Sequence, residues 1–278
     1  MIQEISNSRI DAIRSVSHFK NGQYSSLDIN KTIDFFSRYY IDAFEDLTNI
    51  DENTVIADIG TGYGWLAIAW ALRTPAKIIA IDMDAERLDA AREIAEIIGV
   101  ADRIDWRVGS LGNLPLEDAS VDIACCIEVV EHVYGDTGAI ADLGRVSRDI
   151  VLVTTPNRLF PAIAHDTRLP FCHWLPVPLR ILYAKAVRSQ YTEIDNVFWS
   201  RRQLTQILSG YDYLDGFMHR KDFAAYMQVY PYYLPYGSGK MVHRIGRMKG
   251  LYFALASRVK LLSTHMLPNL ASIYRRSR

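Results

Sequence analysis

Short apolar runs alternate with segments of helical periodicity through the middle of the chain. A short apolar run is typical of a buried strand, and apolar residues at spacings of three and four are typical of a helix. Residues 66–72 and 85–98 are predicted helices, and the predicted strands are 55–57, 77–81, 104–108, 121–127 and 150–154. Because strands and helices alternate, we predict an α/β fold with a doubly wound, mostly parallel sheet covered on both faces.

Further elements are expected on either side of this alternation. Asp28 is a candidate N-cap for a helix over residues 29–47, which we expect to pack on the sheet. Ser200 is a candidate N-cap for a helix that leads into a sixth strand over 211–217. Residues 270–274 are expected to form a last strand at the edge of the sheet, which makes it seven-stranded.

The turn after the first predicted strand is rich in glycine. It reads TVIADIGTGYGW, with Gly60, Gly62 and Gly64 between Asp58 and the next helix. Glycine lets the backbone turn sharply and approach a ligand closely, and the first N–H groups of a helix lack intrahelical partners. The dinucleotide fingerprint needs a glycine where this chain has Trp65. The pattern therefore favours a nucleotide site of another kind.

An acid about 20 residues after such a turn, at the end of the second strand, typically binds ribose hydroxyls. Asp82 closes the second predicted strand and occupies this position. Asp84 follows closely, but it fits the N-cap of the helix over 85–98. We therefore interpret Asp82 as the ribose ligand.

Residues 54–157 resemble the core of the class I S-adenosylmethionine-dependent methyltransferases, in particular the group that includes ubiquinone-biosynthesis O-methyltransferases. The matching pieces, in order, are DIGTGYG, AIDMD, LPLEDASVDIACCIEVVEHV, the arginine in LGRVSRDIVLV, and TTPNR. The resemblance implies a Rossmann-like methyltransferase sheet closed by an antiparallel strand, with S-adenosyl-L-methionine as the cofactor. No metal site is expected, because the sequence has no metal-ligand spacing.

The resemblance also implies roles for single residues. The methionine part of the cofactor would lie on Asp58 and the glycine turn, the ribose on Asp82, and the adenine in residues 109–111. Many relatives have an acid at the position of Ser110, so the adenine contact is expected to differ here. The implied cofactor-binding residues are Asp58, Gly60, Thr61, Gly62, Gly64, Asp82, Met83, Gly109, Ser110, Leu111 and Glu128.

Candidate catalytic residues follow the fourth strand, because ligands of open α/β sheets bind beyond the carboxyl ends of strands. His132 is a candidate general base, with a packed helix histidine as the alternative, and Glu131 is expected to be a solvated helix residue. His165 is the second candidate base. Tyr24 is a candidate lid residue, with an ordinary surface tyrosine as the alternative.

A long segment rich in proline and aromatic residues, 158–196, interrupts the core. It is too long for a simple connection, so we interpret it as a lid that shapes the acceptor pocket, with a short helix from Pro178. A loop packed for stability is the alternative. The expected organisation is an N-terminal helical arm (1–50), an S-adenosylmethionine-binding core (51–157), a lid insertion (158–198), and the remainder of the core with a basic amphipathic helix before the last strand (199–278).

The net charge of −1 hides an asymmetry between the two halves. Residues 1–150 carry 13 Lys and Arg against 26 Asp and Glu, whereas residues 151–278 carry 18 against 6. This split indicates an anionic partner for the second half, or attraction between the halves. Residues 241–262 predict a basic amphipathic helix, a candidate for peripheral membrane contact or for guiding a phosphate-bearing substrate. A core-packed helix with a solvated basic face is the third interpretation.

The sequence also bears on compartment. No apolar run reaches the ~18 residues of a membrane span, and no secretory signal pattern opens the sequence. Cys125 and Cys126 are expected to be small core residues, because the three cysteines give neither a disulfide framework nor metal-ligand spacing. We expect a cytoplasmic protein, with membrane association as an open alternative.

The resemblance favours O-methylation of a small molecule in biosynthesis, such as a sugar, a lipid-linked glycan or a natural product. N- or C-methylation is the alternative within this class. The alternatives of other classes are an NAD-dependent oxidoreductase, against which Trp65 argues, and a non-catalytic S-adenosylmethionine-binding protein. Nucleic-acid amino groups are disfavoured as acceptors, since TTPN at 154–157 is not an NPPY-like motif. The sequence leaves the acceptor and the oligomeric state open.

Overall fold

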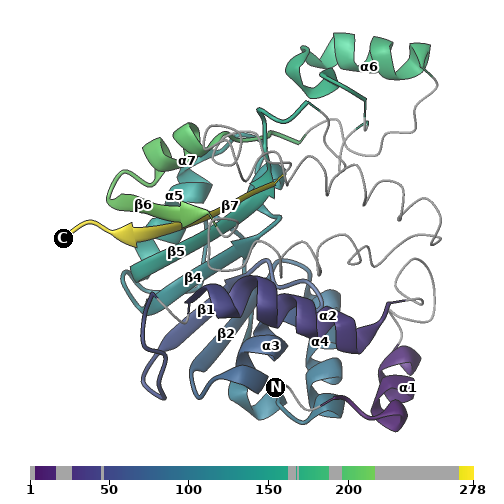
Figure 1. Ribbon diagram of the computed structural model, residues 1–278, viewed down its shortest axis with the longest axis vertical. Helices are drawn as coiled ribbons and strands as arrows, with labels where there is room; N and C mark the ends of the chain where they lie inside the picture. The colour runs from purple at the N-terminus through teal and green to yellow at the C-terminus, as the bar shows by residue number, and fades with distance from the viewer. Residues whose placement is uncertain are drawn as a thin grey trace.

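The computed structural model describes residues 4–16, 27–44, 47–161, 167, 169–187, 196–216 and 269–278. These residues form a seven-stranded sheet with helices on both faces (Figure 1), as the sequence predicts. The strands are β1 (Val55–Ile59), β2 (Lys77–Asp82), β3 (Ile104–Val108), β4 (Val121–Ile127), β5 (Ser147–Pro156), β6 (Tyr211–Gly216) and β7 (Asn269–Arg276). The helices are α1 (Asn7–Ser15), α2 (Ile29–Phe36), α3 (Trp65–Arg73), α4 (Ala85–Ile98), α5 (Thr137–Val146), α6 (Val177–Ala186) and α7 (Arg201–Ile207).

The strand order is β3-β2-β1-β4-β5-β7-β6. The first five strands pair in parallel, so their carboxyl ends meet at one edge of the sheet. β7 pairs antiparallel with both β5 and β6. The prediction that the last strand lies at the sheet edge is therefore wrong, because β6 is the outer strand. The inner place of β7 agrees with its sequence: the five consecutive residues 270–274 are all buried, which is typical of a strand covered on both faces.

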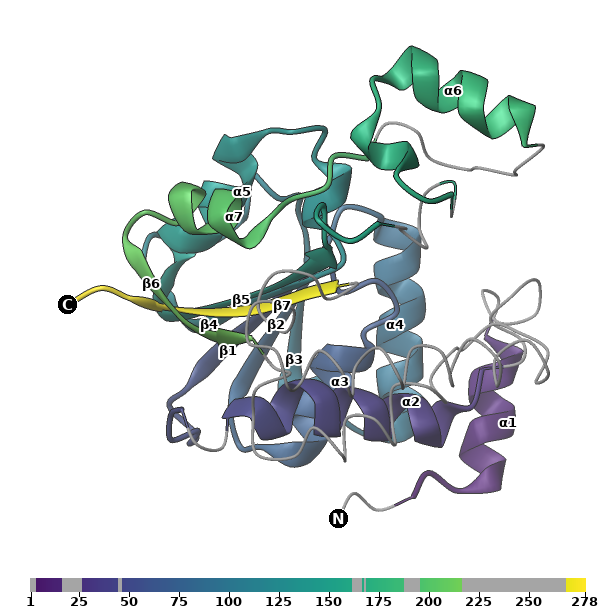
Figure 2. The same cartoon turned by 45° about the horizontal axis from the view of Figure 1, so that its top comes forward.

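The two faces of the sheet carry two apolar clusters. One cluster joins the sheet to α1, α2, α3 and α4, and the other joins it to α5 and α7, as the edge-on view of the sheet shows (Figure 2). Cys125 belongs to the first cluster and Cys126 to the second, because successive strand side chains point to opposite faces. Both cysteines are fully buried, which confirms the prediction that they are core residues.

The helix predicted over residues 29–47 is shorter in the structure. The Asp28 side chain caps α2 as predicted, but α2 ends at Phe36 and continues as a π-helical turn over Ser37–Ile41 and a 3₁₀ turn over Asp42–Phe44. The wider turn keeps Tyr40, Ile41 and Phe44 buried.

Some predicted features lie outside the described residues. These are the lid candidate Tyr24, the second candidate base His165 and the basic helix over 241–262. None of the helices in the described residues is long and apolar enough to cross a membrane.

Candidate active site

The candidate site lies where the strand order reverses, at the carboxyl ends of β1 and β4. Ile59 of β1 pairs with Ile81 of β2 on one side and with Cys126 of β4 on the other. This register places Asp58, Asp82 and Glu128, which lie at or just beyond the carboxyl ends of their strands, along one edge of the sheet. Ligands of open α/β sheets bind in the crevice at this point.

The glycine turn is fixed to β2 through its backbone. The N–H groups of Gly60 and Thr61 both donate to the carbonyl oxygen of Ile81, at 2.8 and 2.9 Å. Gly60 has a φ of 73°, and a Cβ there would lie 2.3 Å from Cγ2 of Val129. Only glycine allows this conformation and this approach at the same position. The turn is therefore packed directly on the segment that follows β4.

Asp58 connects the turn to the start of α3. Its Oδ2 accepts hydrogen bonds from the Thr61 hydroxyl at 2.6 Å and from the Ala67 N–H at 3.1 Å. The side chain is only 2% exposed, and burial raises the pKa of Asp58 to about 7, against the lowering effect of these two bonds. Asp58 thus holds the turn in place and is able to carry a proton near neutral pH.

Asp82 holds the same turn from the end of β2. Its carboxylate accepts hydrogen bonds from the N–H groups of Gly62 at 2.8 Å and Asp84 at 3.0 Å. Asp84 caps α4, as predicted, by accepting from the Arg87 N–H. Met83, between the two acids, is 76% exposed. The structure therefore brings Asp82 and the glycine turn together, and their contact with a ribose stays a prediction.

The predicted adenine segment, residues 109–111, follows β3 and is hydrogen-bonded to the end of β2. The Gly109 N–H donates to the Asp82 carbonyl at 3.0 Å, and a Cβ on Gly109 would lie 2.5 Å from Cδ of Pro115. Ser110 forms an isolated bridge with Asn113, and Leu111 packs partly buried against the core. The segment is thus a tight loop whose path depends on the residues just after it.

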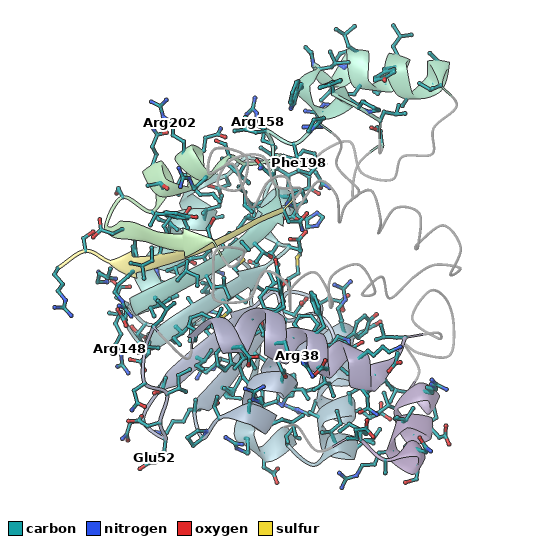
Figure 3. The ribbon with its side chains drawn as sticks, viewed as in Figure 1. Arg38, Glu52, Arg148, Arg158, Phe198 and Arg202 are labelled. Atoms are coloured by element: carbon teal, nitrogen blue, oxygen red, sulfur yellow. The ribbon has the colours of Figure 1, made fainter. Side chains whose placement is uncertain are left out.

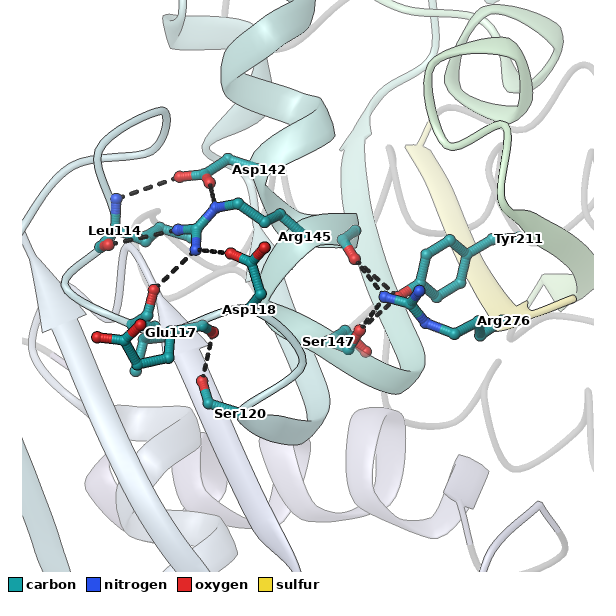
Figure 4. A network of polar contacts seen from close by, with 11 residues as sticks. Leu114, Glu117, Asp118, Ser120, Asp142, Arg145, Ser147, Tyr211 and Arg276 are labelled. Carbon is teal, nitrogen blue, oxygen red and sulfur yellow. Dashed lines mark hydrogen bonds and ion pairs between the residues drawn. The ribbon is translucent and has the colours of Figure 1, made fainter.

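Arg145, the first of the two arginines in LGRVSRDIVLV, fixes the end of that loop (Figure 4). Its guanidinium donates to Oδ1 of Asp142 at 2.6 Å, to Oδ1 of Asp118 at 2.7 Å and to the Leu116 carbonyl at 2.8 Å. Asp142 in turn accepts from the Leu114 N–H. These bonds connect the loop to α5.

Glu128 follows β4 in an unusual backbone conformation, with a φ of 54°. Its Oε1 accepts from the Thr154 hydroxyl at 3.1 Å and from Nδ2 of Asn269 at 3.0 Å. The residue is half-buried, but Oε2 is shielded from solvent. Burial raises the pKa of Glu128 to about 7, against the lowering effect of the two hydrogen bonds.

Glu131 contradicts the expectation of a solvated helix residue. It lies in a 3₁₀ turn over Val130–His132 and is fully buried. Its Oε2 accepts from the Thr155 hydroxyl at 2.9 Å, and its carbonyl accepts from the Val197 N–H. The prediction is wrong because the short turn directs this side chain back onto β5, which supplies a buried hydroxyl.

His132, the candidate base, is exposed, and its Nδ1 is 3.0 Å from Oδ1 of the buried Asn196. The alternative of a packed helix histidine is not what the structure shows. The partners Thr154, Thr155, Asn196 and Asn269 were not predicted. The two threonines could have been found from the sequence, because polar residues at the end of an apolar strand are candidates for a site. The two asparagines come from distant segments and belong to no sequence motif.

The α6 segment, residues 169–187, stands away from the sheet in both views. It is anchored at its base, where the Arg158 carbonyl accepts from Nε2 of His173 and Nε1 of Trp174. His173 also meets the Phe198 ring edge-on, at 5.7 Å. Figure 3 labels Arg158 and Phe198 at this junction. The predicted short helix is confirmed as α6, and a lid function stays a prediction.

The core of this chain matches known proteins. Residues 57–157 match the model of a family described as a methyltransferase domain. A probable S-adenosylmethionine-dependent methyltransferase of Mycolicibacterium smegmatis is 36% identical over 118 residues, which cover 41% of this chain and 42% of the relative. A ubiquinone biosynthesis O-methyltransferase of Methylocella silvestris is 33% identical over 115 residues, which cover 41% of this chain and 44% of the relative. The chain spans about two-fifths of the length of these relatives.

The fold is similar to that of magnesium protoporphyrin IX methyltransferase from Synechocystis, solved with bound S-adenosylhomocysteine. The TM-score is 0.52 and the identity 14%, over 97% of this chain and 94% of the other. At this identity the likeness concerns the fold alone.

The site residues fit S-adenosylmethionine, the cofactor that the relatives indicate. The glycine turn lies so close to Val129 that a Cβ at Gly60 would overlap it, and the buried acids Asp58 and Asp82 lie at the carboxyl ends of β1 and β2 beside the turn. Together with the sequence match, these features identify residues 57–157 as a methyltransferase domain of the class I S-adenosylmethionine-dependent family.

Proposed function

We propose that the whole protein is an S-adenosylmethionine-dependent methyltransferase that methylates an oxygen atom of a small molecule. The observation that carries this proposal is the packing of the domain's glycine turn on the segment after β4, through Gly60 and Val129. Proton-accepting side chains, Glu128 and His132, lie on that same segment. The cofactor supplies an electrophilic methyl group, and the protein holds the acceptor atom in line with it, which is worth several kcal/mol.

In this proposal each part of the cofactor meets a different strand end. The methionine part is held by Asp58, Gly60, Thr61, Gly62 and Gly64. The ribose is held by Asp82 and Met83, and the adenine by Gly109, Ser110 and Leu111. The N–H groups at the start of α3 and the acids beside them suit a ligand that carries both a carboxylate and positive charges.

His132 is the proposed general base among the described histidines, since its exposed ring is reachable by an acceptor at the rim of the site. Asn196 contacts Nδ1 of this ring and helps to orient it. His165 remains the second proposed base and lies outside the described residues.

The acceptor is proposed to be anionic or lipid-linked, such as a lipid-linked glycan. The α6 segment supports this, because it carries no acid and exposes large apolar side chains. The most exposed of them, Leu182, has an exposed fraction of 64%. Apolar side chains beside a basic residue such as Lys185 suit a lipid surface. The proposed contact through 241–262 concerns residues outside the described part.

The decisive test of the methyltransferase proposal is calorimetric titration of the purified protein with S-adenosylhomocysteine and with NAD. We expect binding of the first and none of the second; the reverse would favour an oxidoreductase. Candidate acceptors are then incubated with S-adenosylmethionine and followed by mass spectrometry. A gain of one methyl group on oxygen supports the proposal. A gain on nitrogen or carbon keeps the methyltransferase activity but rules out oxygen as the acceptor atom. No gain favours a non-catalytic binding protein.

The lipid-linked acceptor has its own test. Leu182→Asp should weaken sedimentation with vesicles that contain anionic phospholipid, because it puts a charge on the exposed face of α6. Leu214→Asp is the matched control, since Leu214 is an exposed leucine on β6, away from α6. Equal sedimentation of both variants and the parent protein would argue against a lipid contact through α6.

A further inference from the structure

Tyr134 occupies a turn position that is usually glycine or asparagine. The Asp136 N–H donates to the Val133 carbonyl at 2.9 Å, which closes a four-residue turn. Both central residues have a positive φ, 51° at Tyr134 and 85° at Gly135. This combination is characteristic of a type I′ turn, whose central positions are dominated by Gly, Asn and Asp because larger side chains are strained there. The turn therefore holds a tyrosine against its backbone preference.

The Tyr134 ring does not offset this strain by packing on the fold. The side chain is 75% exposed, and within the described residues it forms no hydrogen bond and no ring contact. Phe171 provides the contrast, because its φ is also positive, at 61°, but its ring lies 4.9 Å from the ring of Trp174. Strained residues of the first kind cluster at active sites and ligand clamps.

The turn is fixed beside the candidate base. It begins one residue after His132, whose Nδ1 is 3.0 Å from Oδ1 of Asn196. On the other side of Tyr134, a Cβ on Gly135 would lie 3.7 Å from Cγ2 of Val197. The segment that leads into α7 thus supports the loop before and after Tyr134. The ring is displayed from a fixed loop beyond the carboxyl end of β4, the edge at which ligands of open α/β sheets bind.

An exposed tyrosine offers a ligand a flat apolar face with a hydroxyl at its tip. Such a ring stacks on the face of another ring, and its hydroxyl forms a hydrogen bond at the wet end. Sugars and many natural products are built on six-membered rings that carry hydroxyl groups. The side chain at this turn therefore fits a ring whose hydroxyl is brought toward the site.

We propose that Tyr134 is a specificity-determining residue that stacks on a ring of the methyl acceptor. The proposal rests on the proposed function and adds that the acceptor carries a six-membered ring, a sugar or an aromatic one, beside the atom that is methylated. Tyr134 neither binds the cofactor nor takes part in the transfer of the methyl group. Its strain is the cost of holding the ring in place before the acceptor arrives, which lowers the entropy lost on binding.

Saturation-transfer difference NMR tests the contact on the full chain loaded with S-adenosylhomocysteine. Phenol is the aromatic probe and methyl β-D-glucopyranoside the sugar probe. We expect the parent protein to saturate the ring protons of at least one probe, which identifies the kind of ring. Tyr134→Asn should weaken binding of that probe about threefold or more, the effect of one aromatic contact, and Tyr134→Phe should keep most of the affinity. A parent protein that saturates neither probe overturns the proposal.

Tyr134→Asn also separates recognition from folding. Asparagine followed by glycine is a preferred pair for a type I′ turn, so this variant relieves the strain. We expect the midpoint of urea unfolding to rise while binding of the probe weakens. A residue with only a structural role would show the opposite, a lower midpoint. A lower midpoint therefore means that the ring stabilises the fold, and it overturns the proposal.

Calorimetric titration with S-adenosylhomocysteine separates this proposal from the proposed function. Its affinity should agree within about twofold among the parent protein, Tyr134→Asn and Tyr134→Phe. A tenfold loss in Tyr134→Asn would make the tyrosine a cofactor ligand and overturn the proposal. Probe binding that is equal in all three proteins, with the cofactor affinity intact, overturns the proposal alone. A parent protein that does not bind S-adenosylhomocysteine overturns the proposed function and this proposal with it.

Discussion

The backbone N–H of Gly62 donates a hydrogen bond of 2.8 Å to Oδ2 of Asp82. The acid at the end of β2 therefore holds the glycine turn that follows β1. Because Asp82 is only 5% exposed, this bond is formed away from bulk water, where it is stronger than a surface contact. Asp82 has a structural function in the turn in addition to the proposed contact with the ribose.

Asp82→Ala should weaken binding of S-adenosylhomocysteine by more than about 1 kcal/mol, because it removes a buried charged acceptor. The dissociation constant from isothermal calorimetry measures this loss. Asp82→Asn keeps an oxygen for the Gly62 N–H and should lose less. If both variants bind like the parent protein, Asp82 does not contact the cofactor.

Asp84→Ala is the control for this experiment. Asp84 caps α4 through the Arg87 N–H, and loss of such a cap costs about 1 kcal/mol of stability. We expect a lower free energy of urea unfolding and an unchanged affinity for S-adenosylhomocysteine. The two acids, two residues apart, thus separate cofactor binding from helix stability.

Asp58 should make the stability of the folded protein depend on pH. Its pKa is raised by burial from 3.8 to about 7, so between these values the folded chain binds its proton more tightly than the unfolded chain. The free energy of unfolding therefore falls as pH rises from about 4 to about 7, by a few kcal/mol, and this contribution is constant above that window.

Asp58→Asn is the variant that checks this dependence. It keeps an oxygen for Thr61 and Ala67 but cannot ionise, so urea unfolding across the window should show a flatter pH dependence. Glu128, whose pKa is also raised to about 7, contributes with the same sign, and Glu128→Gln should remove its share. An unchanged slope in both variants would assign the dependence to other groups.

The parts of the fold that depend on local pattern were predictable from the sequence. The bounds 85–98 and 121–127 agree with α4 and β4, because a capped amphipathic helix and a buried apolar run are short-range signals. The capping box between Ser200 and Gln203 is another such signal, and it begins α7 as expected. Asp58, Asp82 and the glycine turn were found for the same reason.

What could not be predicted depends on contacts between distant segments. The inner position of β7 follows from its pairing with both β5 and β6, which no local pattern records. Asn269 reaches Glu128 across 141 positions of the sequence. Glu131 has the polarity of a surface residue, and only the buried Thr155 hydroxyl explains its place in the core. In all three examples a contact between segments far apart in the sequence determines where the residue or strand lies.

Arg145→Lys should destabilise the loop between β3 and β4. Lysine keeps the charge but lacks the planar guanidinium, whose N–H groups donate to Asp142, Asp118 and the Leu116 carbonyl at the same time. We expect a loss of about 1–3 kcal/mol in the free energy of urea unfolding. Affinity for S-adenosylhomocysteine should also fall, because the same loop begins with the predicted adenine segment.

Arg148→Lys is the matched control, three residues further along. Arg148 forms an ion pair with Asp122, and its side chain is 46% exposed. Arg148 makes two hydrogen bonds to Asp122 alone, and exposed pairs contribute little, so this variant should lose less stability than Arg145→Lys. If Arg145→Lys unfolds like the parent protein, the positive charge, and not the set of guanidinium hydrogen bonds, stabilises the loop.

Gly60→Ala should be among the most damaging single methyl additions in the core. The new Cβ would overlap Cγ2 of Val129 and would stand at a φ of 73°. We expect a loss of about 2–4 kcal/mol in the free energy of urea unfolding, from overpacking and left-handed strain together. Adding Val129→Ala removes the overlap but not the strain, so the double variant should recover part of the loss. Gly210→Ala is the control: a Cβ there meets nothing within 4 Å, so the same methyl should cost little. If Gly60→Ala also costs little, the turn and the segment after β4 are not in the tight contact on which the site is built.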